Sequence, residues 1–158
     1  MVETSRRFGT LLAHDIEDIS GCETLRRMAA GELPVPPICR VLEFMITAVE
    51  PGSVTFEGAP SIAFANPLGT THGGWAATLL DSCMGCAVHS RLEVGQSYTT
   101  LEIKVNYTRA MGAETGPVRA VGKVLHMGRR IATAEGKLLD RADRLLAHGS
   151  TTCVVFAA

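Results

Sequence analysis

The sequence is most informative at residues 66–81, which read NPLGTTHGGWAATLLD. The first half of this stretch has the composition of a loop and ends at the paired glycines Gly73 and Gly74. A helix is predicted over about residues 73–90, because nearly every position through Val88 is apolar. Asp81 is the exception, and an unpaired charge buried among apolar neighbours costs several kcal/mol. Aspartate is also a weak helix former, so Asp81 is a candidate for chemistry.

Length and composition describe one soluble domain. The chain has 158 residues, 46% of them hydrophobic and 20% charged, which is enough for a sizeable core and excludes wholesale disorder. A net charge of -1 disfavours nucleic acid as a partner. No apolar run reaches the ~20 residues that cross a bilayer, and no secretory signal is recognisable, so no membrane partner is expected. Five scattered cysteines predict reduced thiols and a cytoplasmic location.

The order of predicted elements is a helical segment, two strands, the long helix and then further strands. The first segment covers about residues 8–30, where Ser20 and Glu23 are spaced as a capping box, and it stops at Gly31 and the prolines that follow. Strands are predicted over residues 41–49, 53–57, 101–107, 118–127, 131–139 and 145–156.

One strongly apolar helix finds enough partner surface only if the sheet curls around it. The pattern therefore predicts an α+β fold in which an antiparallel six-stranded sheet wraps one long central helix. The edge strands of such a sheet are an aggregation hazard, which pairing with a second subunit removes. We therefore expect a homodimer or a homotetramer.

The chain resembles the PaaI-like thioesterases, which are hotdog-fold hydrolases of acyl-coenzyme A thioesters. The resemblance runs from about residue 21 to residue 156 and rests on the following residues: Asn66, Gly69, His72-Gly73-Gly74, Asp81, the stretch 98–107 (YTTLEIKVNY) and Gly128-Arg129-Arg130. It implies a hotdog domain over residues 35–158, preceded by an N-terminal helical extension over residues 1–34. It also implies hydrolysis of an aryl or medium-chain acyl-CoA. Neither a metal nor a cofactor is expected, since coenzyme A belongs to the substrate.

Two residues are assigned the central chemistry. Asp81 is expected to activate water as a general base or to attack the thioester as a nucleophile, and pairing with Ser82 or a lysine is the structural alternative. The backbone N–H of Gly73, at the start of the helix, suits a developing oxyanion; alternatively, the glycines merely let the chain turn. Eight residues of helix separate the two by about 12 Å, so one thioester can meet both only if they come from two subunits.

The remaining assignments each carry a structural alternative. Asn66 either positions the thioester or forms the hydrogen bonds of a turn. His72 either contacts the thioester or starts the helix. Thr100 aligns with a hydroxyl residue that places the water in relatives. Its strand parity, however, puts Thr100 on the polar face with Glu102 while Thr99 shares the apolar face.

Four further residues are predicted substrate contacts: Gly74, Trp75, Arg129 and Arg130. Trp75 lines the acyl pocket or fills the core. The two arginines bind the phosphates of coenzyme A or form a solvated hairpin tip.

Other function classes remain open. Because His72 and Asp81 together offer an acid–base pair, a hotdog hydratase or dehydratase acting on acyl thioesters is one alternative. A non-catalytic acyl-CoA sensor is another. The Cys83-Met84-Gly85-Cys86 motif lies within the helix and not at its N-terminus, so it is interpreted as core packing and not as a redox or zinc site.

Overall fold

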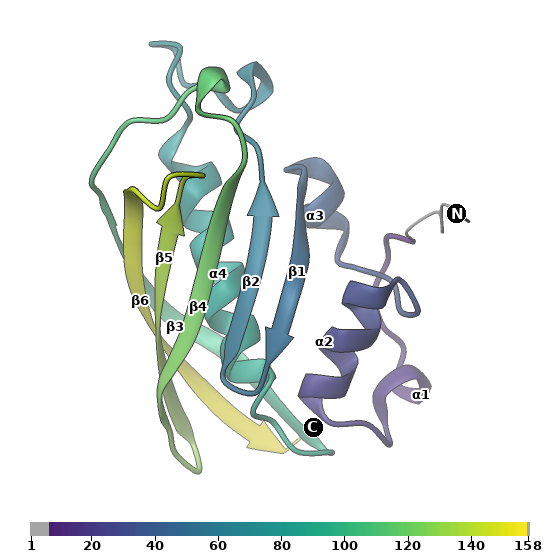
Figure 1. Cartoon of the computed structure of the whole chain (residues 1–158). Helices are drawn as coiled ribbons and strands as arrows, with labels where there is room; N and C mark the ends of the chain where they lie inside the picture. The colour runs from purple at the N-terminus through teal and green to yellow at the C-terminus, as the bar shows by residue number, and fades with distance from the viewer. Residues whose placement is uncertain (1–6, 158) are drawn as a thin grey trace.

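Six antiparallel strands form one sheet around a long helix. The computed structural model describes residues 7–157; residues 1–6 of the predicted N-terminal extension and Ala158 lie outside it. The strand order is β1-β2-β4-β5-β6-β3. The strands are β1 (Phe44–Glu50), β2 (Ser53–Gly58), β3 (Gln96–Tyr107), β4 (Val118–Met127), β5 (Ile131–Leu139) and β6 (Leu145–Ala157). The predicted α+β hotdog architecture is confirmed (Figure 1).

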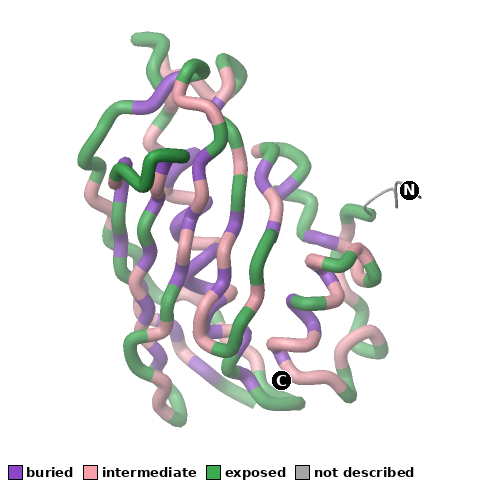
Figure 2. The backbone as a smooth tube through the Cα atoms, viewed as in Figure 1, coloured by how far each residue is buried: buried purple, intermediate pink, exposed green. Residues whose placement is uncertain are grey.

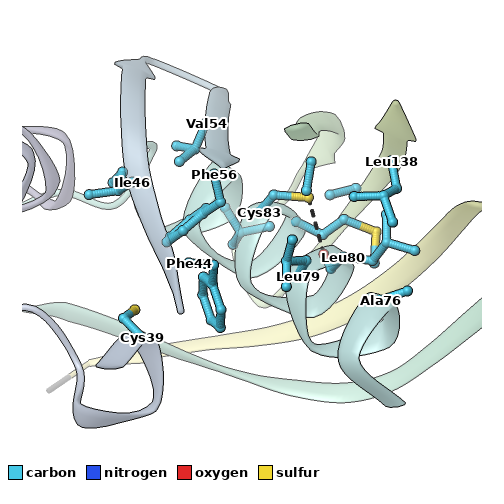
Figure 3. Close-up of a cluster of buried hydrophobic side chains, with 14 of the residues drawn as sticks. Cys39, Phe44, Ile46, Val54, Phe56, Ala76, Leu79, Leu80, Cys83 and Leu138 are labelled. Atoms are coloured by element: carbon cyan, nitrogen blue, oxygen red, sulfur yellow. Dashed lines mark hydrogen bonds between the residues drawn. The ribbon is translucent and has the colours of Figure 1, made fainter. Parts of the chain in front are cut away.

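The helix at the centre is α4 (Gly73–His89), in agreement with the prediction from its apolar sequence. Its residues Leu79, Leu80, Cys83 and Met84 are fully buried and pack against the sheet. Figure 3 shows several of these side chains meeting Phe44, Phe56 and Leu138 from the strands. Most of the apolar surface of α4 is therefore removed from water by the strands, which is the main source of stability in such a fold.

Strand β3 is one edge of the sheet, and it remains unusually open. Leu101 is 58% exposed, Ile103 38% and Tyr107 55%, although all three are apolar or aromatic. Figure 2 shows the mixture of buried and exposed positions along the strands. An edge strand with exposed apolar side chains has the character of an interface.

The N-terminal segment is helical with interruptions. It contains α1 (Ala13–Ile16), α2 (Gly21–Ala30) and α3 (Pro37–Val41), of which α2 packs beside β1 (Figure 1). The predicted capping box is half formed: Ser20 Oγ accepts from Glu23 N–H at 3.3 Å, whereas the Glu23 carboxylate pairs with Arg27. The division of the chain at residue 34 stays a prediction.

The predicted strand over residues 41–49 begins too early. Val41 ends α3, and β1 starts at Phe44. Pro37 is the first residue of α3, where its fixed φ suits a helix start and its missing N–H costs nothing. Two short 3₁₀ turns, η1 (Ile62–Phe64) and η2 (Ala113–Thr115), complete the described elements. Across residues 7–157, no helix is long and apolar enough to cross a bilayer.

The cysteines behave as core residues. Cys83 is fully buried, and its thiol donates to the Leu80 carbonyl (Figure 3). Burial raises the pKa of Cys86 to about 12 and that of Cys39 to about 11, so both thiols stay protonated at neutral pH. All five cysteines are free. The Cys83–Cys86 motif therefore lacks the lowered pKa that redox chemistry requires.

Candidate functional site

One face of α4 runs directly along strand β3. This face carries small or polar residues at every fourth position, namely Gly73, Ala77, Asp81, Gly85 and His89. The strand runs in the opposite direction to the helix, because Tyr107 contacts Gly73, Thr100 contacts Asp81 and Tyr98 covers Gly85. We call this line of contacts the α4–β3 seam.

Asp81 lies in the middle of the seam and is half-buried. The hydroxyl of Thr100 donates to its Oδ1 at 3.3 Å. Asp81 is only partly buried beside the edge strand β3, whereas Leu80 and Cys83 are fully buried. The expected burial among apolar neighbours is therefore incomplete. A carboxylate that is held by one hydrogen bond but reachable from solvent can accept a proton from water.

Thr100 faces the helix because the strand contains a bulge. The register with β6 runs Thr100 to Cys153 and then Glu102 to Thr152, so Leu101 is an extra residue. A bulge of this kind reverses the alternation of side chains. Thr100 consequently shares a face with Ile103 and Tyr107, and the strand-parity argument that set it with Glu102 is wrong.

Gly73 and His72 form the start of α4. His72 is the N-cap residue, and its Nδ1 accepts from the Gly74 N–H at 2.9 Å. Within one chain His72 therefore caps the start of the helix, which was its structural alternative. No acceptor among the described residues is bonded to the Gly73 N–H, which lies at the positive end of the helix dipole. A Cβ at Gly73 would come within 3.0 Å of the Tyr107 ring, whose hydroxyl donates to the Gly73 carbonyl.

Asn66 closes the loop that leads into α4. Its Oδ1 accepts from the Leu68 N–H at 2.9 Å, and its Nδ2 donates to the Thr70 hydroxyl at 2.8 Å. Both polar atoms of the Asn66 side chain therefore form hydrogen bonds within the loop, which agrees with the alternative that Asn66 stabilises a turn. Within one chain Asn66 is bonded neither to Gly73 nor to Asp81.

The predicted substrate contacts lie in three different places. Gly74 is exposed, but its N–H donates a hydrogen bond to the capping side chain of His72. Trp75 is buried in the core, where its Nε1 donates to the Leu42 carbonyl at 2.9 Å and its ring stacks on Phe64. Arg129 and Arg130 are exposed at the tip between β4 and β5.

The arginine tip is nearer to Asp81 than to Gly73. One row of the sheet register joins Thr100, Cys153, Ala132 and Met127, and the tip follows directly after Met127. Gly73 adjoins the far end of β3 at Tyr107. A substrate reaching from the tip to Thr100 would therefore pass along one end of the sheet.

Gly73 and Asp81 do not meet within one chain, because two turns of α4, about 12 Å, separate them. His72 lies still further along from Asp81, so within one chain the acid–base pair of a hydratase does not form either. Nor do the described residues contain a group of three or more His, Cys, Asp or Glu that could hold a metal ion.

Two residues of the seam were missed in the sequence. Tyr107 adjoins Gly73 and Tyr98 adjoins Gly85, and both look like ordinary strand aromatics in the period-two pattern. In the sequence, the only indication of the contact with Tyr98 was the glycine at position 85. Glycine in the middle of a helix costs about 1 kcal/mol, which implies a close contact there.

Comparisons with known proteins show the family and the fold. A family model described as the thioesterase superfamily matches residues 68–147. The 1,4-dihydroxy-2-naphthoyl-CoA hydrolase of Escherichia coli K12 is 33% identical over 89 residues, which are 56% of this chain and 64% of that protein. The chain thus matches less than two thirds of the length of this curated relative.

Two solved structures share the fold. The phenylacetic acid degradation-related protein of Ralstonia eutropha JMP134 is 31% identical, with a TM-score of 0.75 over 82% of this chain and 98% of that one. The PaaI protein of E. coli gives a TM-score of 0.76 over 88% and 98% of the two chains, at 16% identity. The latter comparison supports the fold alone.

Proposed function

This chain belongs to the thioesterase superfamily, and we propose that it hydrolyses aryl or medium-chain acyl-CoA thioesters to the free acid and coenzyme A. The observation that carries the proposal is the pair formed by Asp81 and Thr100 in the α4–β3 seam. The pair combines a reachable carboxylate with a hydroxyl that orients it, and the Gly73 N–H, which has no acceptor among the described residues, lies two turns away on the same face of α4. Hydrolysis of a thioester needs a group that activates water and a donor for the oxyanion.

In the proposed reaction, Asp81 acts on a water molecule beside the thioester carbonyl. As the water oxygen bonds to the carbonyl carbon, its proton passes to the carboxylate. The carbonyl oxygen becomes an oxyanion and accepts a hydrogen bond from a Gly73 N–H. Collapse of this intermediate breaks the C–S bond, and the proton on Asp81 passes to the departing thiolate.

The oxyanion donor comes from a second subunit in this proposal. One thioester group cannot contact both Gly73 and Asp81 when about 12 Å separates them. In the proposal, the Gly73 N–H of one copy therefore binds the oxyanion that forms beside Asp81 of the other copy. A two-fold dimer supplies two such sites at once. The exposed apolar residues of β3 support this arrangement, since they flank the seam at the sheet edge.

Arg129 and Arg130 are proposed to bind the phosphates of coenzyme A. Both guanidinium groups are exposed and lie at the end of the sheet that holds Thr100. Guanidinium forks match phosphate oxygens in charge and geometry. Asn66 and His72 are proposed to shape the loop before Gly73, where their hydrogen bonds already act.

The decisive experiment measures thiol release from aryl, short-chain and long-chain acyl-CoAs by the native protein and by Asp81→Asn. We expect the substitution to lower turnover at least ~100-fold, which is typical for loss of an acid–base group. Asp18→Asn makes the same chemical change at an exposed position outside the seam and is the matched control. Equal release by the Asp81→Asn and native proteins would contradict the assignment.

A second measurement separates the two roles open to Asp81. In single-turnover hydrolysis in ¹⁸O-labelled water, a general base gives acid that carries the label from the first turnover. A nucleophilic carboxylate forms an acyl anhydride, and the label then enters Asp81 when water attacks the aspartyl carbon. Mass spectrometry of the acid and of the protein distinguishes these results.

A further inference from the structure

The bulge in β3 decides which way Thr100 points. Without the extra residue Leu101, the alternation of side chains would set Thr100 on the same face of the sheet as Glu102. With the bulge, Thr100 lies on the helix side, where its hydroxyl donates to Asp81 Oδ1 at 3.3 Å. The candidate catalytic pair therefore depends on the bulged register of this strand.

A buried threonine of β6 is bonded to the bulge. Strand β6 lies beside β3 (Figure 1), and Thr151 of β6 pairs with Ile103 in the register. The hydroxyl of Thr151 donates to the backbone carbonyl of Glu102 at 2.7 Å. Glu102 directly follows the extra residue Leu101. Because Thr151 is only 2% exposed, this bond is shielded from water and satisfies a hydroxyl that burial would otherwise leave without a partner.

The bond from Thr151 favours the bulged register over a regular one. A β-bulge leaves one residue unpaired and interrupts the ladder of backbone hydrogen bonds. A return to regular pairing would shift one part of β3 by a residue and turn its side chains to the opposite face. Such a shift would also move the Glu102 carbonyl away from the Thr151 hydroxyl and break their hydrogen bond.

Cys153 lies between the two threonines. It pairs with Thr100 in the register, follows Thr151 by two residues and is fully buried. Burial raises the pKa of Cys153, and the neighbouring hydroxyls of Thr100 and Thr151 offset this only in part, so the thiol is protonated at neutral pH. Each hydroxyl has one proton, which Thr100 donates to Asp81 and Thr151 to the Glu102 carbonyl. The protonated thiol is no competing anionic acceptor for either proton.

We propose that Thr151 is a positioning residue of the hydrolase: its bond to the Glu102 carbonyl maintains the bulge, and the bulge holds the Thr100 hydroxyl against Asp81. Thr151 acts through Thr100 and is not itself a catalytic residue. The effect on turnover rests on the proposed hydrolase activity. The effect on the Thr100 hydroxyl is a property of the fold and is measurable without any substrate.

Steady-state kinetics test the effect on turnover. Thr151→Val keeps the shape of the side chain and removes the hydroxyl, so we expect kcat to fall about 3- to 10-fold, the worth of one hydrogen bond. KM should stay unchanged, because Thr151 acts through Thr100 and not on the substrate. Thr151→Ser retains a hydroxyl and should restore kcat. Thr152→Val makes the same chemical change at the next residue, on the other face of β6, and is the matched control.

A double-mutant cycle tests whether Thr151 acts through Thr100. If it does, Thr151→Val should lower kcat in the native protein but cause little further loss in Thr100→Val. An equal loss in both backgrounds would show an independent effect on the structure and would overturn the proposal. Native turnover by Thr151→Val would overturn it as well.

The carboxylate of Asp81 provides a measurement that needs no turnover. Its ¹³Cγ resonance is assigned by its absence in Asp81→Asn, and its chemical shift at a fixed pH responds to the hydrogen bond from Thr100. We expect Thr151→Val to move this resonance in the same direction as Thr100→Val, whereas Thr151→Ser and Thr152→Val leave it in place. An unmoved resonance in Thr151→Val would contradict the proposal.

Two further comparisons keep these results decisive. Thermal unfolding verifies that each variant is folded at the assay temperature, and Thr151→Ala, which removes the same hydroxyl, replaces the valine variant if that variant does not fold. If the native protein releases thiol from no thioester, the hydrolase proposal fails. The ¹³Cγ measurement then still decides whether Thr151 holds Thr100 against Asp81.

Discussion

At the scale of single residues, the hydroxyl of Thr100 is the direct neighbour of the candidate catalytic carboxylate. Hydrogen bonds to charged groups contribute about 1.5–3 kcal/mol. Thr100→Val removes the hydroxyl and keeps the shape of the side chain, so we expect kcat/KM for thioester hydrolysis to fall about 10- to 100-fold. Thr100→Ser restores a hydroxyl and should recover most of the loss. Similar kinetics for the Val and Ser variants would show that the hydrogen bond has no catalytic role.

The same residue shows where reasoning from sequence fails at this scale. Asp81, Gly73 and His72 could be placed because an apolar helix with a glycine start and one carboxylate has few interpretations. Thr100 could not be oriented, because a single extra residue at Leu101 reverses the alternation and leaves no mark in the pattern. Tyr98 and Gly85 were missed because their contact joins two elements.

At the scale of an element, helix α2 depends on its N-cap residue, Ser20. The Ser20 hydroxyl oxygen accepts from the Glu23 N–H, and losing such a cap costs about 1 kcal/mol. We therefore expect Ser20→Ala to lower the free energy of unfolding in urea by about that amount, while Ser20→Asp, which also caps, keeps it. If Ala and Asp variants are equally destabilised, the cap is not the cause.

Most elements could be predicted, although β3 begins at Gln96 and not at the predicted residue 101, and α3 was not predicted. Strands β4 and β5 and helix α4 lie within a residue of their predicted bounds, since alternation and apolar runs are strong signals. Helix α3 was missed because Ile38 and Val41 look like strand residues. Pro37 pre-sets the φ angle of a first helical residue, and one turn of helix follows before β1.

At the scale of the whole molecule, the open edge at β3 and the distance between Gly73 and Asp81 are consistent with one explanation. The seam of each chain holds both parts of the proposed catalytic site, too far apart to act on one thioester, and an adjoining copy of the chain would bring its Gly73 to Asp81. The sequence predicted this arrangement because helix geometry alone sets the 12 Å separation. It could not predict the pocket lined by α2, β1 and Tyr98, since the walls of this pocket come from residues far apart in the chain.

The spacing along α4 implies that two inactive proteins can complement each other. Gly73→Pro removes the N–H and suits the first position of a helix, provided that the Tyr107 ring shifts slightly. Asp81→Asn removes the carboxylate. Each variant alone has two defective sites per dimer, but a mixed dimer has one site with both defects and one with neither. After mixing and subunit exchange in equal amounts, about a quarter of native activity should return, since about half of the dimers are mixed.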